Sequence, residues 1–245
     1  KATPPELLIP MLGGKKVVLV GDHRQLPPLF NEHETSYLEA VQQYEGDEEA
    51  PLTMEDFNKY KDMVTSSLFE RYFNQADPSI KETLAIQYRM HPDIMEIINL
   101  FYGGQLQDGN QDRGEAAKSH GLRIDSVEGT PMIVPERHAY WFDSSELLGK
   151  MVLEQRREGS SSAENLAEAQ MILELLRKVE LAYREMNLNQ KVTVGVISFY
   201  FDQVALIRRL LRSESFYAVD VEVNTVDRFQ GKEKEIIFVS LVRNV

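Results

Sequence analysis

The sequence predicts an α/β fold built on a doubly wound parallel sheet with flanking helices. Short apolar runs rich in β-branched residues end at turn or polar residues, which is typical of strands buried on both faces of a parallel sheet. Over roughly the last hundred residues these runs alternate with helical patterns. Strand–helix alternation of this kind favours a parallel sheet over an antiparallel one.

The N-terminal part contains one predicted strand and one acidic stretch. Residues 16–20 (KVVLV) form an apolar run that ends at Gly21, and we predict a buried strand there. Residues 31–62 show no clear period, and within them residues 31–60 carry nine acidic side chains against one lysine. That excess is −8 of the net charge of −12, so we interpret 31–62 as a peripheral insertion.

Four elements are expected in the middle of the chain. They are a short helix over 66–73, a strand over 83–87, a helix that starts at Pro92 and stops at Gly103-Gly104, and a strand over 139–142. Residues 105–135, rich in Gly, Asp and Ser, are expected to be loop.

The C-terminal part carries the clearest alternation. A long helix is predicted over 163–186, with Ser161 or Ser162 as its N-cap. After it we expect a strand over 192–197, a helix over 202–211 and strands over 219–226 and 235–241.

Composition excludes several classes of protein. The chain has 245 residues, of which 42% are hydrophobic and 27% charged, so it is globular and long enough for one large or two small domains. The absence of cysteine excludes disulfides and thiolate metal sites, and we interpret the location as intracellular and cytoplasmic. No apolar run is long enough for a membrane helix, so no membrane partner is expected. The net charge of −12 argues against a protein that coats nucleic acid through bulk charge.

The first polar cluster is GDHRQLPP at residues 21–28, directly after the first predicted strand. Ligands of open α/β sheets bind beyond the carboxyl ends of the strands. Gly21 lets the chain leave the sheet, and Gln25 supplies an amide that can hydrogen-bond a ligand at that edge. Taken alone, the cluster is equally consistent with an ordinary polar loop.

The second cluster is QYRMHP at residues 87–92. Tyr88 has a ring that can stack on a base, and Arg89 can neutralise phosphate charge through a bidentate contact. The alternative is a half-buried tyrosine beside a surface arginine.

The third cluster is VDRFQGKE at residues 226–233, between two predicted strands. Gly231 permits a close approach of the backbone to a ligand, and Glu233 offers a carboxylate to a sugar hydroxyl. Alone, this cluster is also consistent with a turn of mixed charge.

Together, the three clusters resemble the motifs of superfamily 1 helicases in their order and context. With the apolar strand and Val242-Arg243 that follow, they are most similar to the 5′→3′ branch that includes the nonsense-mediated-decay helicase and senataxin. The resemblance spans residues 3–243, excludes 31–62 and is loose across 105–135. It implies a RecA-like fold of the P-loop NTPase type.

The resemblance also implies an ATP site. Gln25 would sense the γ-phosphate and couple it to the nucleic-acid groove, and Tyr88 would stack on adenine. Arg89 would be the arginine finger that reaches the γ-phosphate, while Gly231 would approach the phosphates and Glu233 the ribose. Gln25 and Arg89 are then the catalytic residues, and ATP and Mg²⁺ are the implied cofactors.

Single-stranded nucleic acid, either DNA or RNA, is the partner that the resemblance implies. Pro27 and Pro28 would border the path of the strand. Ser198, Tyr200 and Thr225 would touch its backbone.

The sequence departs from the family's pattern in its lack of G-x-x-x-x-G-K-[ST], the loop that cradles the β- and γ-phosphates. The resemblance would place the acidic pair that holds Mg²⁺ ahead of Lys1 and the last motif beyond Val245. We therefore expect residues 1–80 to be the tail of a first RecA-like motor domain and residues 81–245 to be most of a second. The missing N-terminal motor domain is then a further partner.

Two functional hypotheses follow. The first is a fragment of an ATP-dependent helicase or translocase, inactive alone because half of its ATP site lies elsewhere. The second is a helicase-like domain that binds nucleic acid or a protein without catalysis, which the retained ATP-site residues argue against. No metal site is expected in this chain, because His23 and His91 each lack a second ligand at suitable spacing.

Overall fold

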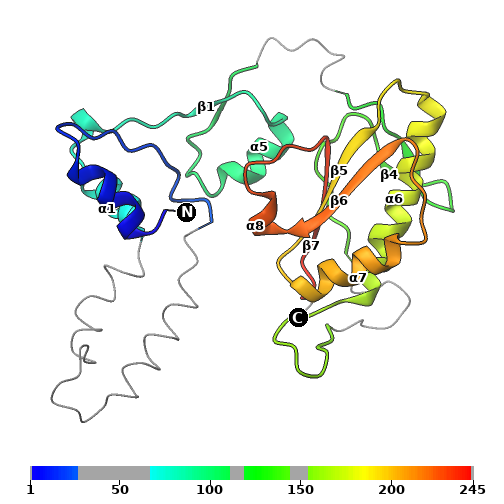
Figure 1. Cartoon of the computed structure of the whole chain (residues 1–245). Coiled ribbons are helices and arrows are strands. Elements are labelled where there is room, and N and C mark those ends of the chain that lie inside the picture. The colour runs from blue at the N-terminus through cyan, green and yellow to red at the C-terminus, as the bar shows by residue number, and fades with distance from the viewer. Residues whose placement is uncertain (1, 27–66, 111–118, 144–153, 244–245) are drawn as a thin grey trace. The chain divides into compact units, whose positions relative to one another are not determined.

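The computed structural model describes residues 2–26, 67–110, 119–143 and 154–243 (Figure 1). The chain forms two compact units: residues 1–87 with 98–109, and residues 88–97 with 110–245. The expected domain boundary between residues 80 and 81 stays a prediction. The acidic stretch 31–62 lies outside the described residues.

The second unit is built on a three-stranded parallel sheet. Strand β5 (Val192–Ser198) lies between β6 (Val219–Thr225) and β7 (Ile236–Ser240) (Figure 1). Ser198 pairs with Thr225 on one side and with Ser240 on the other, so the carboxyl ends of the three strands align at one edge. The predicted parallel sheet is confirmed, although Val226 begins the short helix α8 (Val226–Phe229) rather than ending β6.

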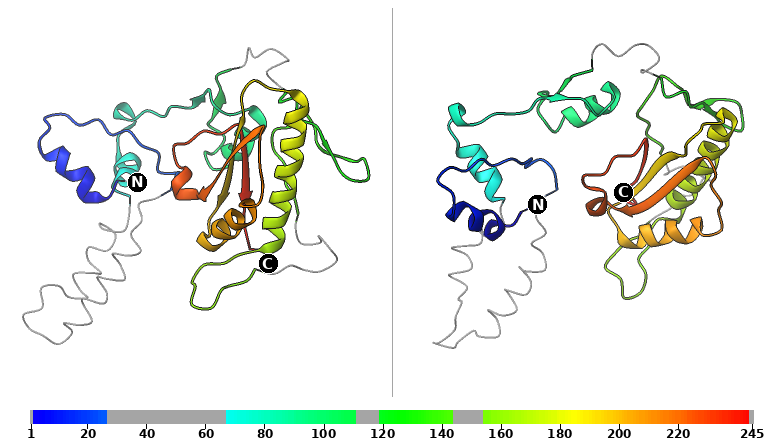
Figure 2. Two further views of the ribbon diagram at one scale, coloured as in Figure 1. Left: turned by 45° about the vertical axis from the view of Figure 1, so that its right-hand side comes forward. Right: turned by 45° about the horizontal axis from the view of Figure 1, so that its top comes forward.

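Two helices build the core of this unit against the sheet. Helices α6 (Leu166–Met186) and α7 (Phe201–Leu211) pack against each other, and both contact the strands (Figure 2). The buried positions of α6 recur every three or four residues, as one face of a helix requires. They meet inward-facing valines of β5; the residues are Ala169, Ile172, Leu176, Val179 and Tyr183 on α6 and Val194 and Val196 on β5.

Helix α6 begins three residues later than predicted, and neither Ser161 nor Ser162 is its N-cap. Asn165 is the N-cap, because its side-chain oxygen accepts a hydrogen bond from the backbone N–H of Glu168 at 3.1 Å. The hydroxyl of Ser162 instead accepts the backbone N–H of Asp202, in the first turn of α7. The serine therefore satisfies the start of the neighbouring helix.

The prediction of a strand at residues 139–142 in this unit is wrong. Residues 139–142 form no strand; the hydroxyl of Tyr140 donates to the carbonyl of Val134 at 2.7 Å and accepts its N–H at 2.8 Å. The Tyr140 hydroxyl thus pairs with both backbone groups of Val134, which a neighbouring strand would otherwise bind. Two short antiparallel strands, β3 (Ile124–Asp125) and β4 (Pro131–Ile133), lie in the region expected to be loop.

The first unit contains short elements. They are the helices α1 (Pro4–Leu12) and α4 (Leu68–Gln75), the 3₁₀ turn η1 (Pro78–Ile80) and the parallel pair β1 (Ile86–Gln87) and β2 (Gln107–Asp108). Helix α4 and β1 confirm two predictions, with β1 shorter than expected. Helix α5 (Pro92–Asn99) starts at the predicted proline and ends before Gly103.

The predicted buried strand at residues 16–20 is wrong. The segment has no regular secondary structure, and Val18 and Val20 are 87% and 89% exposed. A strand buried in a parallel sheet needs a hydrogen-bonded neighbour. Among the described residues, none pairs with this segment as a strand.

Candidate functional site

In the first unit, Asp22 organises the loop that follows residues 16–20. Its carboxylate accepts hydrogen bonds from the side-chain amide of Gln25 at 2.9 Å, from the hydroxyl of Tyr102 at 2.5 Å and from the backbone N–H of Arg24 at 3.0 Å. Burial alone would raise the pKa of Asp22, but these three bonds lower it. The ionised carboxylate of Asp22 therefore accepts the side-chain amide of Gln25 and holds this exposed side chain in place.

Tyr102 and Arg24 tie this loop to the segment after α5. Burial, together with the hydrogen bond to Asp22, raises the pKa of Tyr102 to about 12. The guanidinium of Arg24 donates to the carbonyl of Phe101 and lies 5.6 Å from the centre of the Tyr102 ring. The sequence analysis predicted Gln25 but missed the residues that position it.

In the second unit, two of the sequence clusters meet. The guanidinium of Arg89 forms an ion pair with Glu233, with 2.6 Å between Nη2 and Oε1, and both side chains are 65% exposed. Tyr88 is 66% exposed, and its carbonyl accepts a hydrogen bond from the side chain of Asn110. The fold thus brings together two residues that the sequence assigned separately to ATP.

Gly231 stands in the turn between α8 and β7, with a φ of +82°. The backbone N–H of Lys232 bonds to the carbonyl of the buried Phe229 at 2.9 Å and closes this turn. A Cβ at Gly231 would meet no described atom within 4 Å. Glycine is therefore required here for its backbone conformation rather than for space.

Glu222 of β6 anchors the lysines on either side of Glu233. Its carboxylate pairs with Lys232 and, at 3.0 Å, with Lys234, and it accepts the amide of Asn224 at 3.0 Å. The hydrogen bonds from Lys232 and Lys234 lower the pKa of Glu222 to about 2. Sequence analysis missed this residue, and a lone glutamate within a strand gives no signal.

We expect the stabilisation contributed by Glu222 to depend on pH. A carboxyl with an ordinary pKa of 4.5 and a folded-state pKa of about 2 contributes fully above pH 4.5 and loses its contribution as the pH falls through about 2. The thermal unfolding midpoint of Glu222→Gln should lie below that of the wild type at pH 7. The difference should shrink between pH 4.5 and pH 2.

Asp220→Asn is the matched control, because Asp220 is exposed on the same strand. It should change the midpoint little at either pH. A Glu222→Gln difference of constant size from pH 7 to pH 2 would contradict the role of the ionised carboxylate.

Ser198 lies in the core rather than on a surface. It is fully buried, and its hydroxyl donates to the carbonyl of Ser240 at 3.1 Å. The hydroxyl also accepts the backbone N–H of Tyr200 at 3.3 Å, so it is engaged within the fold, and its expected contact with nucleic acid stays a prediction. Gln203 is similarly buried, and its amide donates to the hydroxyl of Ser240 and the carbonyl of Asn165.

The other residues expected to contact nucleic acid are more accessible. Tyr200, the N-cap of α7, is half-buried, and the guanidinium of Arg243 lies 5.8 Å from its ring centre. Thr225, the N-cap of α8, is also half-buried. Pro27 and Pro28 lie outside the described residues.

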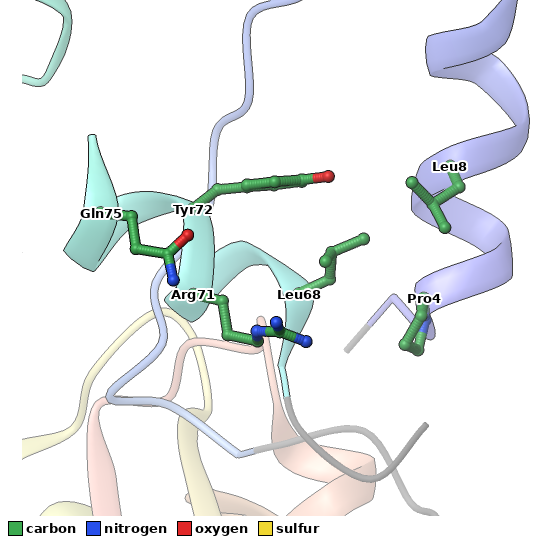
Figure 3. Close-up of a pocket in the computed structure, with 6 residues that line it drawn as sticks. All are labelled: Pro4, Leu8, Leu68, Arg71, Tyr72 and Gln75. Carbon is green, nitrogen blue, oxygen red and sulfur yellow. The ribbon is translucent and has the colours of Figure 1, made fainter. Parts of the chain in front are cut away.

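A small pocket in the first unit lies apart from these motifs. It has a volume of about 290 Å³ and opens between α1 and α4 (Figure 3). Its lining is formed by Pro4, Leu8, Leu68, Arg71, Tyr72 and Gln75, none of which belongs to the three sequence clusters. We assign no ligand to it.

The residues of the second unit fit part of an ATP molecule. An exposed aromatic ring at Tyr88 suits a base, an exposed guanidinium at Arg89 suits a phosphate, and an exposed carboxylate at Glu233 suits a sugar hydroxyl. The ion pair between Arg89 and Glu233 must open or be shared before Arg89 contacts a phosphate. No phosphate-binding loop motif is present in the sequence, so these groups would hold only part of the nucleotide.

The parallel sheet, with motif residues after its strands, defines an α/β domain of the RecA-like class. Residues 64–245 match the sequence model of a family described as an AAA domain, and the chain belongs to this family. Residues 1–32 match a second family model, which is also described as an AAA domain.

Curated relatives extend the similarity over the whole chain. The chain is 30% identical to an ATP-dependent helicase of Methanocaldococcus jannaschii over 99% of its own length and 30% of the relative. It is 30% identical to a DNA replication ATP-dependent helicase/nuclease of Schizosaccharomyces pombe, covering 98% of the chain and 15% of the relative. For the regulator of nonsense transcripts 1 homolog of Neurospora crassa, the identity is 30%, over 100% of the chain and 19% of the relative.

The chain thus spans less than a third of the length of each of these relatives. The resemblance to superfamily 1 helicases is confirmed. None of the described helices is both long enough and apolar enough to cross a membrane.

Proposed function

We propose that the chain supplies one half of the ATP site and part of the single-strand groove of an ATP-dependent nucleic-acid helicase. The observation that carries this proposal is the ion pair between Arg89 and Glu233, which joins two clusters more than a hundred residues apart in the order expected for such helicases. The names of the relatives support it, since each is an ATP-dependent helicase or a regulator of nonsense transcripts.

The proposed roles at ATP follow from the residue types. Tyr88 stacks on adenine, Glu233 binds the ribose and Gly231 lies against the phosphates. Arg89 neutralises the charge that builds on the γ-phosphoryl oxygens during transfer. Gln25, held by Asp22, senses the γ-phosphate.

The other half of the site would have to come from elsewhere. A loop that cradles the phosphates and the carboxylates that hold Mg²⁺ would be supplied by an N-terminal motor domain. ATP hydrolysis would then drive movement along a single strand of DNA or RNA, with Tyr200 and Thr225 as contacts to its backbone. We propose an intracellular location for this activity.

The alternative is a helicase-like domain that binds nucleic acid or a protein without catalysis. The side chains of Gln25, Tyr88, Arg89 and Glu233 are all exposed, so each is accessible to a nucleotide, which favours the enzyme. Only hydrolysis itself separates the two functions.

The test compares ATP hydrolysis by this chain with hydrolysis by a longer protein that joins it to a domain with a phosphate-binding loop. Phosphate release is measured with and without single-stranded DNA or RNA. The longer protein should hydrolyse ATP faster when the strand is added, and the chain alone should not exceed background. Hydrolysis by the purified chain alone, or a longer protein that binds strands without hydrolysis, would refute the proposal.

A further inference from the structure

Three histidines of the second unit cluster at the start of α5. The rings of His91 and His138 stack with centroids 3.4 Å apart and planes 12° from parallel, and the ring of His120 meets His138 edge-on at 5.0 Å. Positions 91, 120 and 138 are far apart in the sequence, so the cluster is a product of the fold.

The carboxylate of Asp93 lies against both stacked rings. Its oxygens are 3.5 Å from Nδ1 of His91 and 3.8 Å from Nδ1 of His138. One oxygen also accepts the backbone N–H of His138 at 3.0 Å, which fixes the carboxylate beside the rings. The side chains of both stacked histidines are 14% exposed, and that of Asp93 is 41% exposed, so the site is reached from solvent on the carboxylate side.

The ring nitrogens of the three histidines are not equally engaged. Nδ1 of His120 accepts the N–H of Leu122, and its Nε2 bonds to the carbonyl of Arg137. Nδ1 of His138 is buried and makes no hydrogen bond with any described residue. A buried polar atom without a partner is costly, and a bound ligand is one way in which proteins satisfy it.

We propose that His91, Asp93 and His138 bind a divalent transition-metal ion such as Zn²⁺. Their candidate ligand atoms all lie within 4.8 Å of one another. In a tetrahedral zinc site the ligand atoms are about 3.3–3.5 Å apart, because each lies about 2.0–2.2 Å from the metal. The two histidine–carboxylate distances of 3.5 and 3.8 Å approach this spacing. Because a metal lies near the plane of each imidazole that binds it, the stacked rings of His91 and His138, whose planes are 12° from parallel, would rotate out of the stack to bind one ion.

The chemistry of the donors selects the class of ion. Neutral imidazole nitrogens suit zinc, copper, iron and nickel, whereas magnesium and calcium prefer oxygen ligands. His91 Nδ1 accepts a weak hydrogen bond from the N–H of Asp93 at 3.2 Å, which a metal would replace.

The ion would tie the first turn of α5 to the loop around His138. Because His91 follows Arg89 by two residues, the tie would also fix the chain that carries the proposed arginine finger. Spacing along the chain gave no sign of this site, because His138 lies more than forty residues from His91 and Asp93.

The experiment titrates Zn²⁺ into the untagged, metal-free 245-residue chain by isothermal titration calorimetry at pH 7.5. We expect one site, together with a higher thermal unfolding midpoint in the presence of Zn²⁺. His138→Gln and Asp93→Asn should each weaken binding at least about tenfold, since even the loss of a residue that only supports a ligand costs about 10–100-fold. Asp93→Asn keeps a side-chain oxygen that can accept the N–H of His138. This variant should therefore stay folded, and a loss of Zn²⁺ affinity in it would report the lost ligand rather than unfolding.

His120→Gln is the matched control from the same cluster. Both of its ring nitrogens are engaged within the fold, so this variant should retain Zn²⁺ affinity. An excess of Mg²⁺ should not displace Zn²⁺ from the wild type. The proposal is overturned if the wild type binds no Zn²⁺, or if folded His138→Gln and Asp93→Asn variants bind it as tightly as the wild type.

Discussion

Arg89→Ala should lower the rate of ATP hydrolysis by about a thousandfold in a longer protein that joins this chain to a domain with a phosphate-binding loop. The reason is that negative charge builds on the γ-phosphoryl oxygens in the transition state, and a guanidinium placed there is worth about 10³–10⁵ in rate. The change should act mainly on kcat, with a smaller effect on nucleotide affinity. Strand-stimulated phosphate release under saturating ATP measures it.

Tyr88→Ala provides the contrast, because its ring is assigned to adenine rather than to the reacting phosphate. It should weaken nucleotide binding by about 1–3 kcal/mol, the range found for stacking of a base on an aromatic side chain. Arg212→Ala is the matched control, because it also removes an exposed arginine. Arg212 is the C-cap residue of α7 and belongs to none of the three sequence clusters. It should leave both quantities near wild type.

Thermal unfolding midpoints separate a catalytic effect from loss of the fold. Arg89 and Tyr88 are both well exposed, so neither substitution removes a core contact. A folded Arg89→Ala protein that hydrolyses ATP at the wild-type rate would refute the assignment of the arginine finger. A Tyr88→Ala protein with unchanged nucleotide affinity would refute the proposal that the Tyr88 ring stacks on adenine.

The sequence predicted the sheet of the second unit well because its strands are continuous apolar runs with neighbours in the same region. Residues 192–197 and 235–241 were expected as strands, and β5 and β7 occupy these positions. The same pattern failed at residues 16–20, where an apolar run is exposed and unpaired among the described residues. An apolar run shows that a segment is suited to a sheet, but pairing with a neighbour decides whether it forms a strand.

Helix ends were predicted less well than helix bodies, because several polar residues compete for each cap. Ser161, Ser162 and Asn165 all carry a side chain suited to an N-cap. Tertiary contacts decide among them: Ser162 bonds to the start of α7, and Asn165 caps α6. Ser162 and Asp202 are 40 positions apart, and the backbone N–H of Asn165 bonds to the side chain of Gln203, 38 positions away, so local sequence does not reveal these contacts.

Sequence motifs predicted which residues contact ATP, but they did not predict the residues that hold the motif loops in place. Arg89 and Glu233 lie in separate sequence clusters, and both were expected to contact ATP. Their ion pair shows that the fold brings the two side chains together. Glu222 and Tyr102 support the motif loops from distant positions and belong to no motif. Ser198 lies at the predicted end of a strand, but its side chain is buried, which the strand pattern alone does not reveal.

Glu180→Ala should cause a large loss of stability in the second unit. Glu180, on α6, is only 6% exposed, and its carboxylate accepts the backbone N–H groups of Tyr217, Ala218 and Val219 at 2.8–3.1 Å. These residues lead into β6, and Val219 is almost fully buried. Without the carboxylate, three N–H groups lose their acceptor, and that of the buried Val219 has little access to water.

We expect the free energy of unfolding to fall by about 3 kcal/mol, because each buried donor left without a partner costs about 1–3 kcal/mol. Denaturant unfolding followed by far-UV circular dichroism measures the change. Glu180→Gln should lose less, since its amide keeps one oxygen acceptor. Glu174→Ala, an exposed position on the same helix, should stay within about 0.5 kcal/mol of the wild type.

The size of the Glu180 effect also tests how β6 is held in register. Val219 pairs with Val192 across the sheet, and the carbonyl of Ala218 accepts the N–H of Val192 at 2.9 Å. The carboxylate therefore fixes the residues at which the pairing of β5 and β6 begins. If Glu180→Ala unfolds at the same denaturant concentration as Glu174→Ala, the strand pairing alone holds this segment, and the carboxylate adds nothing to it.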